Sequence, residues 1–276
     1  MNYSAAVMSE GAALSIVVPT YNERDRLAEL VDAVFGVCKA RQVDLELVIV
    51  DDNSPDGTGQ LADALAEGRR MIVVHRAGKL GLGTAVVAGF ARATAPIVGV
   101  MDADFSHPPT LLPTLLHVFH ATSADLVIAS RYVKGGSTPN WPRRRRMLSR
   151  LGCLLAWPLT SIRDPASGFF LIRTDVARGT SIKAGGFKIC LELVIRAWPR
   201  RIVEVPYRFE DRELGESKMG WGEAAKYLIQ LRDLTWFRLT GPRRPRQELL
   251  QLTPDDVRNV DRAAPASPVT RSAATR

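Results

Sequence analysis

Acidic and polar residues gather in three short segments in the N-terminal half of the chain. These segments are residues 19–23, Pro-Thr-Tyr-Asn-Glu; residues 51–58, Asp-Asp-Asn-Ser-Pro-Asp-Gly-Thr; and residues 102–104, Asp-Ala-Asp. Alternate side chains of an extended segment point the same way, so the Asp102 and Asp104 carboxylates can face one hard cation. Mg²⁺ and Mn²⁺ accept such a pair and keep water and phosphate oxygens as their other ligands. The pair therefore predicts a metal site that would neutralise a departing diphosphate.

Each acidic segment directly follows a short apolar run, at residues 14–18, 45–50 and 97–101. Apolar residues recur at helical spacing between these runs, and the alternation continues to about residue 130. This pattern predicts a doubly wound α/β domain, with a mainly parallel sheet covered by helices on both faces. Such sheets bind ligands beyond the carboxyl ends of their strands, where the acidic segments fall. A single strand-end carboxylate, such as Asp56, can simply cap a helix, but three clusters at one edge favour a site.

Dinucleotide and phosphate-loop sites are the alternatives for such a sheet. Dinucleotide binding needs Gly-x-Gly-x-x-Gly directly after the first strand, where this chain has residues 19–23. An NAD or FAD enzyme is therefore disfavoured. Residues 78–84, Gly-Lys-Leu-Gly-Leu-Gly-Thr, resemble a phosphate loop but lack its Gly-Lys-Ser/Thr ending. We interpret them as a tight turn into a helix, with a nucleotide contact as the less favoured reading.

The chain is basic, with a formal net charge of +8. This charge favours an anionic partner, which could be nucleic acid, a phosphorylated substrate or an acidic membrane surface. Residues 143–146 are four arginines that lead into an apolar helix, so they offer cations to a lipid phosphate and apolar surface to its chain. A solvated basic face on a core helix is the alternative. A nucleic-acid-binding protein is disfavoured, because the acidic strand ends would repel a phosphate backbone.

Taken in order, Pro-x-Tyr-Asn-Glu, Asp-Asp-x-Ser-x-Asp-Gly-Thr and Asp-Ala-Asp-x-x-His-Pro-Pro resemble the motifs of family 2 glycosyltransferases with the GT-A fold. Polyprenyl-phosphate, or dolichyl-phosphate, mannose synthases are more similar still, through residues 130–136, 140–142, 164–169 and 211–218. The resemblance covers about residues 14–240. It implies a metal-dependent, inverting transfer of mannose from GDP-mannose to a polyprenyl phosphate. Transfer of glucose or another sugar from a UDP donor to the same lipid class is the alternative.

The resemblance also implies roles for individual residues. The base and ribose would be held by Pro19, Tyr21, Glu23 and Asp52. Mg²⁺ or Mn²⁺ would be held by Asp102, Asp104 and, through water, Ser106. The donor phosphates would be held by Arg212 and Lys218, and Asp102 would also face the sugar nucleotide. The acceptor phosphate would be held by Arg131, Arg145 and Ser149, the last two being four residues apart on one face of a predicted helix. The implied catalytic residues are Asp104, Arg131, Arg212 and Lys218.

No general base is expected for this reaction. A phosphate monoester has a second pKa near ~6, so it is largely dianionic at neutral pH and can attack directly. His107 is accordingly interpreted as structural. Glu192 is a candidate donor-site residue without an assigned role.

We expect a flexible arm at residues 1–12, a GT-A domain at 13–222, an amphipathic helix at 223–240 and a basic, disordered tail at 241–276. The helix suits either a membrane interface or packing against the domain. The sequence shows no secretory signal and no apolar run of about 18 residues. We therefore expect a cytoplasmic protein, peripheral at the cytoplasmic face of a membrane, with an integral-membrane protein as a candidate partner. Free, buried thiols are expected at Cys38, Cys153 and Cys190.

Overall fold

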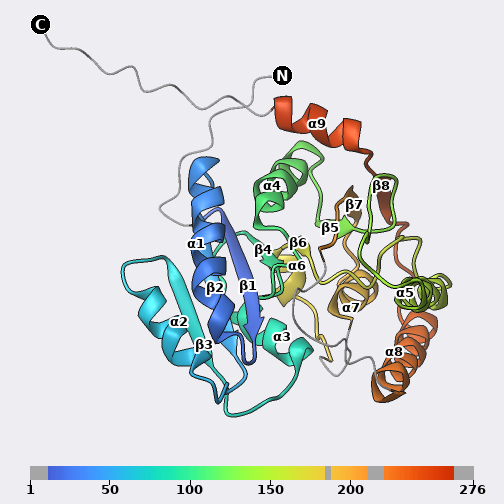
Figure 1. Ribbon diagram of the computed structural model, residues 1–276. Coiled ribbons are helices and arrows are strands. Elements are labelled where there is room, and N and C mark those ends of the chain that lie inside the picture. The colour runs from blue at the N-terminus through green and yellow to red at the C-terminus, as the bar shows by residue number, and fades with distance from the viewer. Residues whose placement is uncertain (1–11, 184–187, 211–220, 264–276) are drawn as a thin grey trace, which may run out of the picture.

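Eight strands form one sheet within residues 12–183, 188–210 and 221–263, the part of the chain that the computed structural model describes (Figure 1). Their order across the sheet is β3-β2-β1-β4-β6-β5-β7-β8, and of these strands only β6 runs antiparallel to its neighbours. The strands are β1 (Leu14–Thr20), β2 (Leu45–Asp51), β3 (Met71–His75), β4 (Ile97–Val100), β5 (Leu126–Ser130), β6 (Phe170–Arg173), β7 (Arg201–Pro206) and β8 (Glu248–Gln251). The predicted α/β class with a mainly parallel sheet is confirmed.

Helices cover both faces of this sheet (Figure 1). One face carries α1 (Arg24–Ala40), α2 (Thr58–Ala66), the short 3-10 helix η1 (Pro109–Leu111), α4 (Leu112–Ala121) and α9 (Pro254–Ala263). The other carries α3 (Leu82–Arg92), α5 (Arg143–Ala156), α6 (Thr174–Arg178), α7 (Ile189–Arg196) and α8 (Trp221–Thr240). Every residue of β2 is buried, because both sides of the strand are covered. Continuous apolar runs are therefore the sequence pattern that this architecture requires.

The path of the chain opens a crevice at the carboxyl ends of β1 and β4. From β1 the chain moves outward to β2 and β3, and it then crosses back to β4 on the other side of β1. The connections after β1 and β4 therefore diverge, and such a switch point is where open α/β sheets bind ligands. All three acidic segments follow strands at this edge.

The C-terminal segment corrects one prediction. Residues 241–263, interpreted from their composition as part of a disordered tail, have defined structure: β8 pairs with β7, and α9 packs against α4. The reason is a set of anchors on the preceding elements. Trp198 Nε1 donates to the Pro245 carbonyl at 2.8 Å, and Gln247 Nε2 donates to the Val194 carbonyl at 3.1 Å. These partners are 47 and 53 residues apart in the chain, so local composition could not reveal them.

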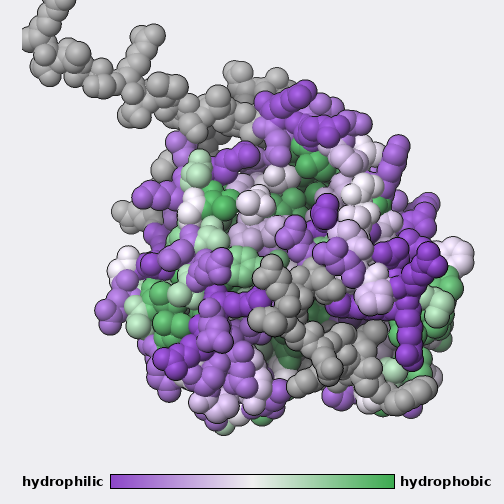
Figure 2. Space-filling model, viewed as in Figure 1, coloured by the Kyte–Doolittle hydropathy of each residue, from purple (hydrophilic) through white to green (hydrophobic). Residues whose placement is uncertain are grey.

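Helices α5 and α8 expose a continuous series of large apolar side chains. Tyr227 Oη donates to the Gly152 carbonyl at 2.7 Å and joins α8 to α5. Leu231 and Leu234 of α8 are buried against the domain, so this helix packs through one face and exposes another. We call the exposed set the α5/α8 apolar surface: Met147, Leu148, Leu151, Leu154, Leu155, Trp157, Leu228, Ile229, Trp236 and Leu239. Figure 2 shows apolar residues at this edge of the molecule, over α5.

None of the helices in the described part of the chain combines the length and the apolar character needed to cross a bilayer.

The three cysteines are free thiols, as predicted, and Cys38 and Cys190 are buried whereas Cys153 is partly buried. Burial raises the pKa of Cys38 to about 11 and that of Cys153 to about 12. Both thiols are therefore protonated at neutral pH and are poor nucleophiles.

Candidate active site

Hydrogen bonds fix the connection after β1 against the connection after β2. Three consecutive backbone N–H groups donate to side chains of residues 51–58: Asn22 to Ser54 Oγ (3.0 Å), Glu23 to Thr58 Oγ1 (3.0 Å) and Arg24 to Asp56 Oδ2 (3.3 Å). Slight burial acts to raise the pKa of Asp56, but hydrogen bonds from Thr58 hold it below its usual value. Asp56 thus holds the segment before α2 through Thr58 and Arg24. The helix cap considered for Asp56 is not formed, because the N-cap residue of α2 is Gly57 and no side chain caps the helix. Pro19, Tyr21 and Glu23 lie at the end of β1 and in this fixed loop, between β1 and α1.

The two adjacent carboxylates at the end of β2 have different partners. Asp51 turns into its own loop, where it accepts hydrogen bonds from the backbone N and the Oγ of Ser54 at 2.9 and 2.5 Å. Asp52 accepts from Arg76 Nη1 at 2.5 Å and from the Gly81 N–H at 3.0 Å. Asp51 therefore shapes the loop, whereas Asp52 joins the end of β2 to the connection that follows β3.

That connection between β3 and α3 contributes cations that the sequence analysis did not assign to the site. Arg76 Nη2 donates to Thr84 Oγ1 at 2.5 Å, so Arg76 links Asp52 to the first turn of α3. Lys79 Nζ lies 3.8 Å from the centre of the Tyr21 ring, a close cation–π contact. Both cations lie in the segment that immediately follows a strand. Lys79 belongs to residues 78–84, for which a nucleotide contact was the less favoured interpretation, whereas Arg76 was not predicted; its position directly after a strand was the available signal.

A tight turn after β4 gathers the three residues predicted to hold a metal. Phe105 has a φ of 60°, which is uncommon for a bulky side chain. This conformation folds the chain back, so that the Ser106 N–H donates to Asp104 Oδ1 at 3.0 Å. Asp104 and Ser106 are buried, whereas the Asp102 side chain is 32% exposed. Strained backbone of this kind is often found where a site must be held rigid.

His107 lies buried behind this turn and supports it. Its Nδ1 accepts a hydrogen bond from the Asp102 N–H at 3.0 Å, and its ring stacks on Phe169 with centroids 5.0 Å apart. A Cβ atom added at Gly168 would lie 3.2 Å from the His107 ring and 3.6 Å from Asp102 Oδ2, so a glycine permits this close approach. Burial lowers the pKa of His107 even though Asp102 acts to raise it. A neutral, buried ring agrees with the structural role predicted for His107.

The donor set at the turn fits a hard divalent cation. Asp102 and Asp104 supply carboxylate oxygens, and the partly exposed Asp102 faces a region where water and diphosphate oxygens can complete the coordination. No group of three His, Cys, Asp or Glu residues in the described parts of the chain is arranged to hold a metal by itself. A cation here would therefore depend on oxygens of the bound nucleotide, as Mg²⁺ and Mn²⁺ in nucleotide sites commonly do.

On the other side of the crevice, Arg131 at the end of β5 is bound to a buried carboxylate. Its Nε and Nη2 each donate to Asp164 at 2.7 Å, and its backbone N–H donates to Asp164 Oδ2 at 2.9 Å. Burial acts to lower the pKa of Arg131, but Asp164 raises it above its ordinary value, so the guanidinium keeps its charge. Asp164 thus occupies the Nε–H and one N–H of Nη2, so a phosphate would have to use the remaining N–H groups on Nη1 and Nη2, a condition that the sequence did not reveal.

Glu204 of β7 positions Asp164 in turn. This fully buried carboxylate accepts hydrogen bonds from the Asp164 N–H at 3.0 Å, from Ser130 Oγ at 2.9 Å and from Gln251 Nε2 at 3.0 Å. Burial raises the pKa of Glu204, although hydrogen bonds from the Arg163 N–H, Ser130 and the Asp164 N–H oppose the shift. Because Gln251 lies in β8, the C-terminal strand reaches the Arg131–Asp164 pair through one intermediate side chain.

The start of α5 adds further groups beside Arg131. The guanidinium carbon of Arg145 lies 4.2 Å from the centre of the Trp141 ring, and that of Arg131 lies 5.3 Å from the same ring. Tyr132 Oη donates to Ser149 Oγ at 2.7 Å. The three predicted acceptor residues, Arg131, Arg145 and Ser149, are thus gathered around two aromatic side chains. We call these five residues the acceptor cluster.

The remaining arginines of the basic run have other environments. Arg146 Nη2 donates to the carbonyls of Thr138 and Trp141 at 3.1 and 3.3 Å and holds the loop before α5. Arg143 and Arg144 are exposed. Arg145 and Arg146 therefore both contact Trp141, Arg145 through the ring and Arg146 through the backbone carbonyl.

Three other sequence-predicted residues are less informative. Arg212 and Lys218 lie outside the described residues. Glu192 is buried in α7, where it pairs with Arg196 at 3.0 Å and accepts from the Lys183 N–H at 2.7 Å. These contacts with the protein explain why a carboxylate is buried at Glu192, and no bound ligand is needed to explain it.

Residues 15–190 match the family model described as Glycosyl transferase family 2. The chain belongs to glycosyltransferase family 2. The matched residues include the fixed loops after β1 and β2, the turn after β4 and the whole acceptor cluster. Family 2 membership therefore covers both sides of the crevice.

Several curated family 2 relatives are named for mannose transfer to a lipid phosphate. A dolichol-phosphate mannosyltransferase from Pyrococcus furiosus is 38% identical over 219 residues, which are 78% of this chain and 61% of that protein. A polyprenol monophosphomannose synthase from Mycolicibacterium smegmatis is 41% identical over 74% of this chain and 80% of its own length. A dolichol-phosphate mannosyltransferase from Saccharomyces cerevisiae is 37% identical over 81% of this chain and 87% of its own length. The chain thus spans less than two thirds of the Pyrococcus relative and most of the other two.

Solved structures of glycosyltransferases share the fold. Glucosyl-3-phosphoglycerate synthase from Mycobacterium tuberculosis, in complex with Mn²⁺, UDP and its product, superposes with a TM-score of 0.60 at 20% identity over 84% of this chain and 82% of that one. A mannosyltransferase from Pyrobaculum calidifontis, in complex with GDP-Man and Mn²⁺, superposes with a TM-score of 0.57 at 19% identity. The superposition covers 85% of this chain and 66% of that one. The predicted GT-A type of fold is confirmed.

Proposed function

We propose that this glycosyltransferase moves mannose from GDP-mannose to the phosphate of a polyprenyl lipid, with inversion at the anomeric carbon. One observation supports the proposal above all: two unlike half-sites meet at one sheet edge. Carboxylates with Arg76 and Lys79 line the side of β1 to β4, and the acceptor cluster lies where an exposed apolar helix begins. The names of the curated relatives point to the same chemistry.

On the donor side, Pro19, Tyr21, Glu23 and Asp52 would hold the nucleotide. Asp102, Asp104 and Ser106 would hold Mg²⁺ or Mn²⁺, which when bound neutralises charge on the leaving diphosphate. Arg212 and Lys218 would bind the donor phosphates. Two observations support this assignment: the carboxylates share one rigid turn, and related folds contain Mn²⁺ or Mg²⁺ together with a nucleotide.

On the acceptor side, Arg131 and Arg145 would orient the lipid phosphate. One phosphate oxygen forms a bond to the anomeric carbon, while the bond from that carbon to the GDP oxygen breaks and GDP leaves. The attacking phosphate is largely dianionic at neutral pH, so no proton has to be removed. The neutral, buried His107 is consistent with a reaction that needs no base at this position.

The acceptor lipid also requires access to a membrane. The α5/α8 apolar surface continues from the acceptor cluster along α5, and Arg143, Arg144 and Arg150 are exposed on the same helix. Apolar side chains flanked by cations are the features of a helix that lies in a membrane interface. We therefore place the enzyme peripherally at the cytoplasmic face of a membrane.

Parallel assays with labelled GDP-mannose and labelled UDP-glucose test this function. Each donor is incubated with a short, water-soluble polyprenyl phosphate and Mg²⁺ or Mn²⁺, and the lipid-linked product is measured. We expect product from GDP-mannose only. If product formed faster from UDP-glucose than from GDP-mannose, the donor would be UDP-glucose and the assignment of GDP-mannose would be wrong. Absence of transfer from both donors, together with metal-independent and salt-sensitive binding of random DNA, would favour the nucleic-acid alternative.

A further inference from the structure

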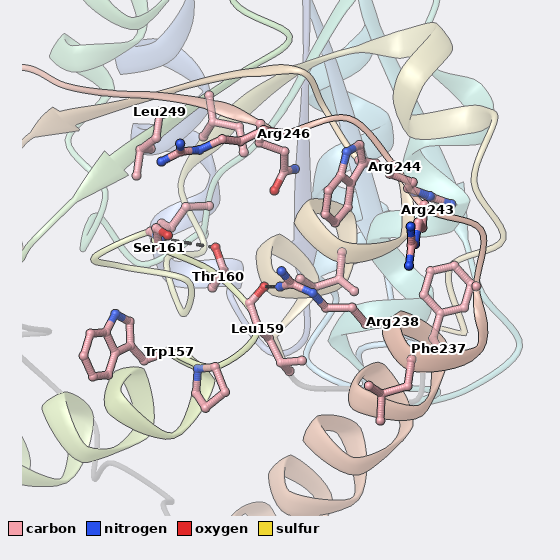
Figure 3. A pocket seen from close by; sticks show the side chains of 18 of the residues that line it. Trp157, Leu159, Thr160, Ser161, Phe237, Arg238, Arg243, Arg244, Arg246 and Leu249 are labelled. Carbon is pink, nitrogen blue, oxygen red and sulfur yellow. Dashed lines mark hydrogen bonds between the residues drawn. The ribbon is translucent and has the colours of Figure 1, made fainter.

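A large pocket lies at the opposite end of α5 from the acceptor cluster. It has a volume of about 1140 Å³, which is ample for a ligand. Its wall is formed by the loop after α5, the C-terminal end of α8 and the segment that leads into β8 (Figure 3). The residues at the beginning of β7 and β8 also line it, so the pocket borders the sheet edge opposite to the acidic strand ends.

The pocket is separate from the acceptor cluster. Arg145 stands near the first turn of α5, and Trp157 directly follows the last turn. Trp157 lies twelve residues after Arg145 in the sequence, which corresponds to roughly 18 Å at the rise of an α-helix. A ligand phosphate bound at one end of α5 therefore does not occupy the site at the other end.

The pocket carries an excess of positive charge. Arg238, Arg243, Arg244 and Arg246 line it, whereas its carboxylate, Glu248, is paired with Arg201 at 2.9 Å. None of the four lining arginines forms an ion pair with a residue that the structure describes. An arginine in this situation offers several N–H donors that match the oxygens of a phosphate.

Two of these arginines are fixed in place by neutral groups. Arg238 Nη1 donates to the Leu159 carbonyl, the contact drawn across the pocket in Figure 3. Arg244 Nη1 donates to the Arg196 carbonyl at 2.8 Å, and its guanidinium carbon lies 5.6 Å from the Trp198 ring. Carbonyls and aromatic faces orient a guanidinium without neutralising its charge, so the positive potential of the pocket remains available to an anion.

The rim of the pocket is apolar and continuous with the α5/α8 apolar surface. Trp157 is 70% exposed and Leu239 is 76% exposed, and both line the pocket. A free phosphate would make no contact with such a rim. An anionic lipid offers a phosphate that can bind the arginines and an acyl chain that can pack against the apolar side chains. We propose that this pocket binds the phosphodiester headgroup of an anionic phospholipid as a second lipid site, distinct from the acceptor site. The inference rests on the proposed membrane location.

Vesicle binding of a double variant tests the proposal. Arg243 and Arg246 are exposed, so Arg243→Ala/Arg246→Ala should fold like the wild type, which thermal unfolding verifies. Wild-type protein should bind vesicles of phosphatidylcholine with phosphatidylglycerol more tightly than vesicles of phosphatidylcholine alone. The double variant should lose this preference by roughly fivefold per arginine, or about 25-fold.

A matched control separates the pocket from net charge. Arg41→Ala/Arg92→Ala removes two exposed arginines outside the pocket and should keep nearly all of the preference for anionic vesicles. If both double variants lost the same amount of the preference for anionic vesicles, the proposal would be overturned. The attraction would then depend on the net charge of the protein and not on the pocket.

Soluble ligands distinguish a lipid site from a phosphate site. Short-chain phosphatidylglycerol, kept below its micelle concentration, should bind the wild type in calorimetry and should fail to bind Arg243→Ala/Arg246→Ala. Inorganic phosphate should bind at least tenfold more weakly than the short-chain lipid. Equal affinities for the two ligands, or no lipid binding by the wild type, would overturn the lipid assignment.

The outcome can be told apart from that of the proposed transfer reaction. Mannose transfer to a water-soluble polyprenyl phosphate should be unchanged in Arg243→Ala/Arg246→Ala, since no membrane is needed. If wild-type protein transfers no mannose but shows the pocket-dependent lipid binding, the proposed function fails and the lipid site stands. If the wild type transfers mannose but Arg243→Ala/Arg246→Ala binds lipid as well as the wild type does, the proposed function stands and the lipid site fails.

Discussion

The pairing of Arg131 with Asp164 fixes the orientation of a guanidinium that we propose binds the acceptor phosphate. Both side chains are buried, so their attraction is weakly screened, and removal of one partner leaves a buried charge without compensation. Asp164→Ala should therefore lower the free energy of unfolding by about 3–5 kcal/mol. It should also raise the half-saturating concentration of a soluble acceptor, because Arg131 loses its fixed orientation. Urea unfolding and acceptor titration measure the two effects.

Arg131→Ala/Asp164→Ala is the control for this prediction. Removal of both charges should recover part of the lost stability but none of the acceptor affinity. Wild-type acceptor saturation in Asp164→Ala would show that the pair has no part in positioning Arg131 for the acceptor.

The turn that carries Asp104 supplies a second prediction at the scale of single residues. Asp104→Ala should nearly abolish transfer while the fold is kept, and Asp104→Asn, which retains the side-chain shape, should do the same. In calorimetry, Mn²⁺ should strengthen GDP binding to the wild type but not to either variant. Full activity of Asp104→Ala in excess chelator would contradict the metal assignment.

His107 gives the stability of the protein a defined pH dependence. Burial keeps the folded-state pKa of His107 below its ordinary value of 6.5. As the pH falls through 6.5, the unfolded chain takes up a proton that the folded protein does not, so stability decreases until the folded-state pKa is reached. His107→Asn should reduce the loss of stability that sets in as the pH falls through 6.5. The free energy of unfolding of both proteins is measured by urea unfolding at each pH. The same dependence on pH in wild type and variant would refute this prediction.

At the scale of elements, α5 assigns different tasks to neighbouring arginines. Arg145 contacts Trp141 in the acceptor cluster, whereas Arg144 is exposed. Loss of one charge-assisted contact costs about 1.5–3 kcal/mol. Arg145→Ala should therefore raise the half-saturating concentration of a short, soluble polyprenyl phosphate by about one to two decades, with little change in GDP affinity. Arg144→Ala is the matched control and should leave both values unchanged. Equal acceptor saturation in the two variants would remove Arg145 from the site.

The elements also show what the sequence could reveal and what it could not. Apolar runs followed by acidic segments predicted β1, β2 and β4 with the site at their carboxyl ends, because burial on both faces imposes that pattern. The partner of Arg131 was hidden, since Asp164 lies 33 residues further along the chain. Residues 241–263 were misjudged for a related reason: a segment rich in Pro and Arg folds here only through distant anchors such as Trp198.

At the scale of the whole molecule, the α5/α8 apolar surface should govern behaviour in the absence of lipid. Exposed apolar patches larger than usual mark interaction sites and promote association. Leu151→Gln/Leu154→Gln should reduce self-association in sedimentation velocity and weaken vesicle binding. The same variant should retain transfer to a short, soluble acceptor, because these side chains are exposed outside the acceptor cluster. Loss of that activity would mean that the surface serves catalysis directly.

The position of β6 has a consequence for how the protein is made. The strand lies between β4 and β5 and pairs with both, although it is synthesised after both of them. Until residues 170–173 have left the ribosome, β1 to β4 can pair as a sheet, whereas β5 has no strand to pair with, because both of its neighbours, β6 and β7, come later in the chain. Asp102 follows a strand of the four-stranded sheet, and Arg131 follows the unpaired β5. The two sides of the site are therefore joined late, and a chain stalled before β6 would expose the unpaired edge of β4 and the unpaired strand β5, both of which are prone to aggregate.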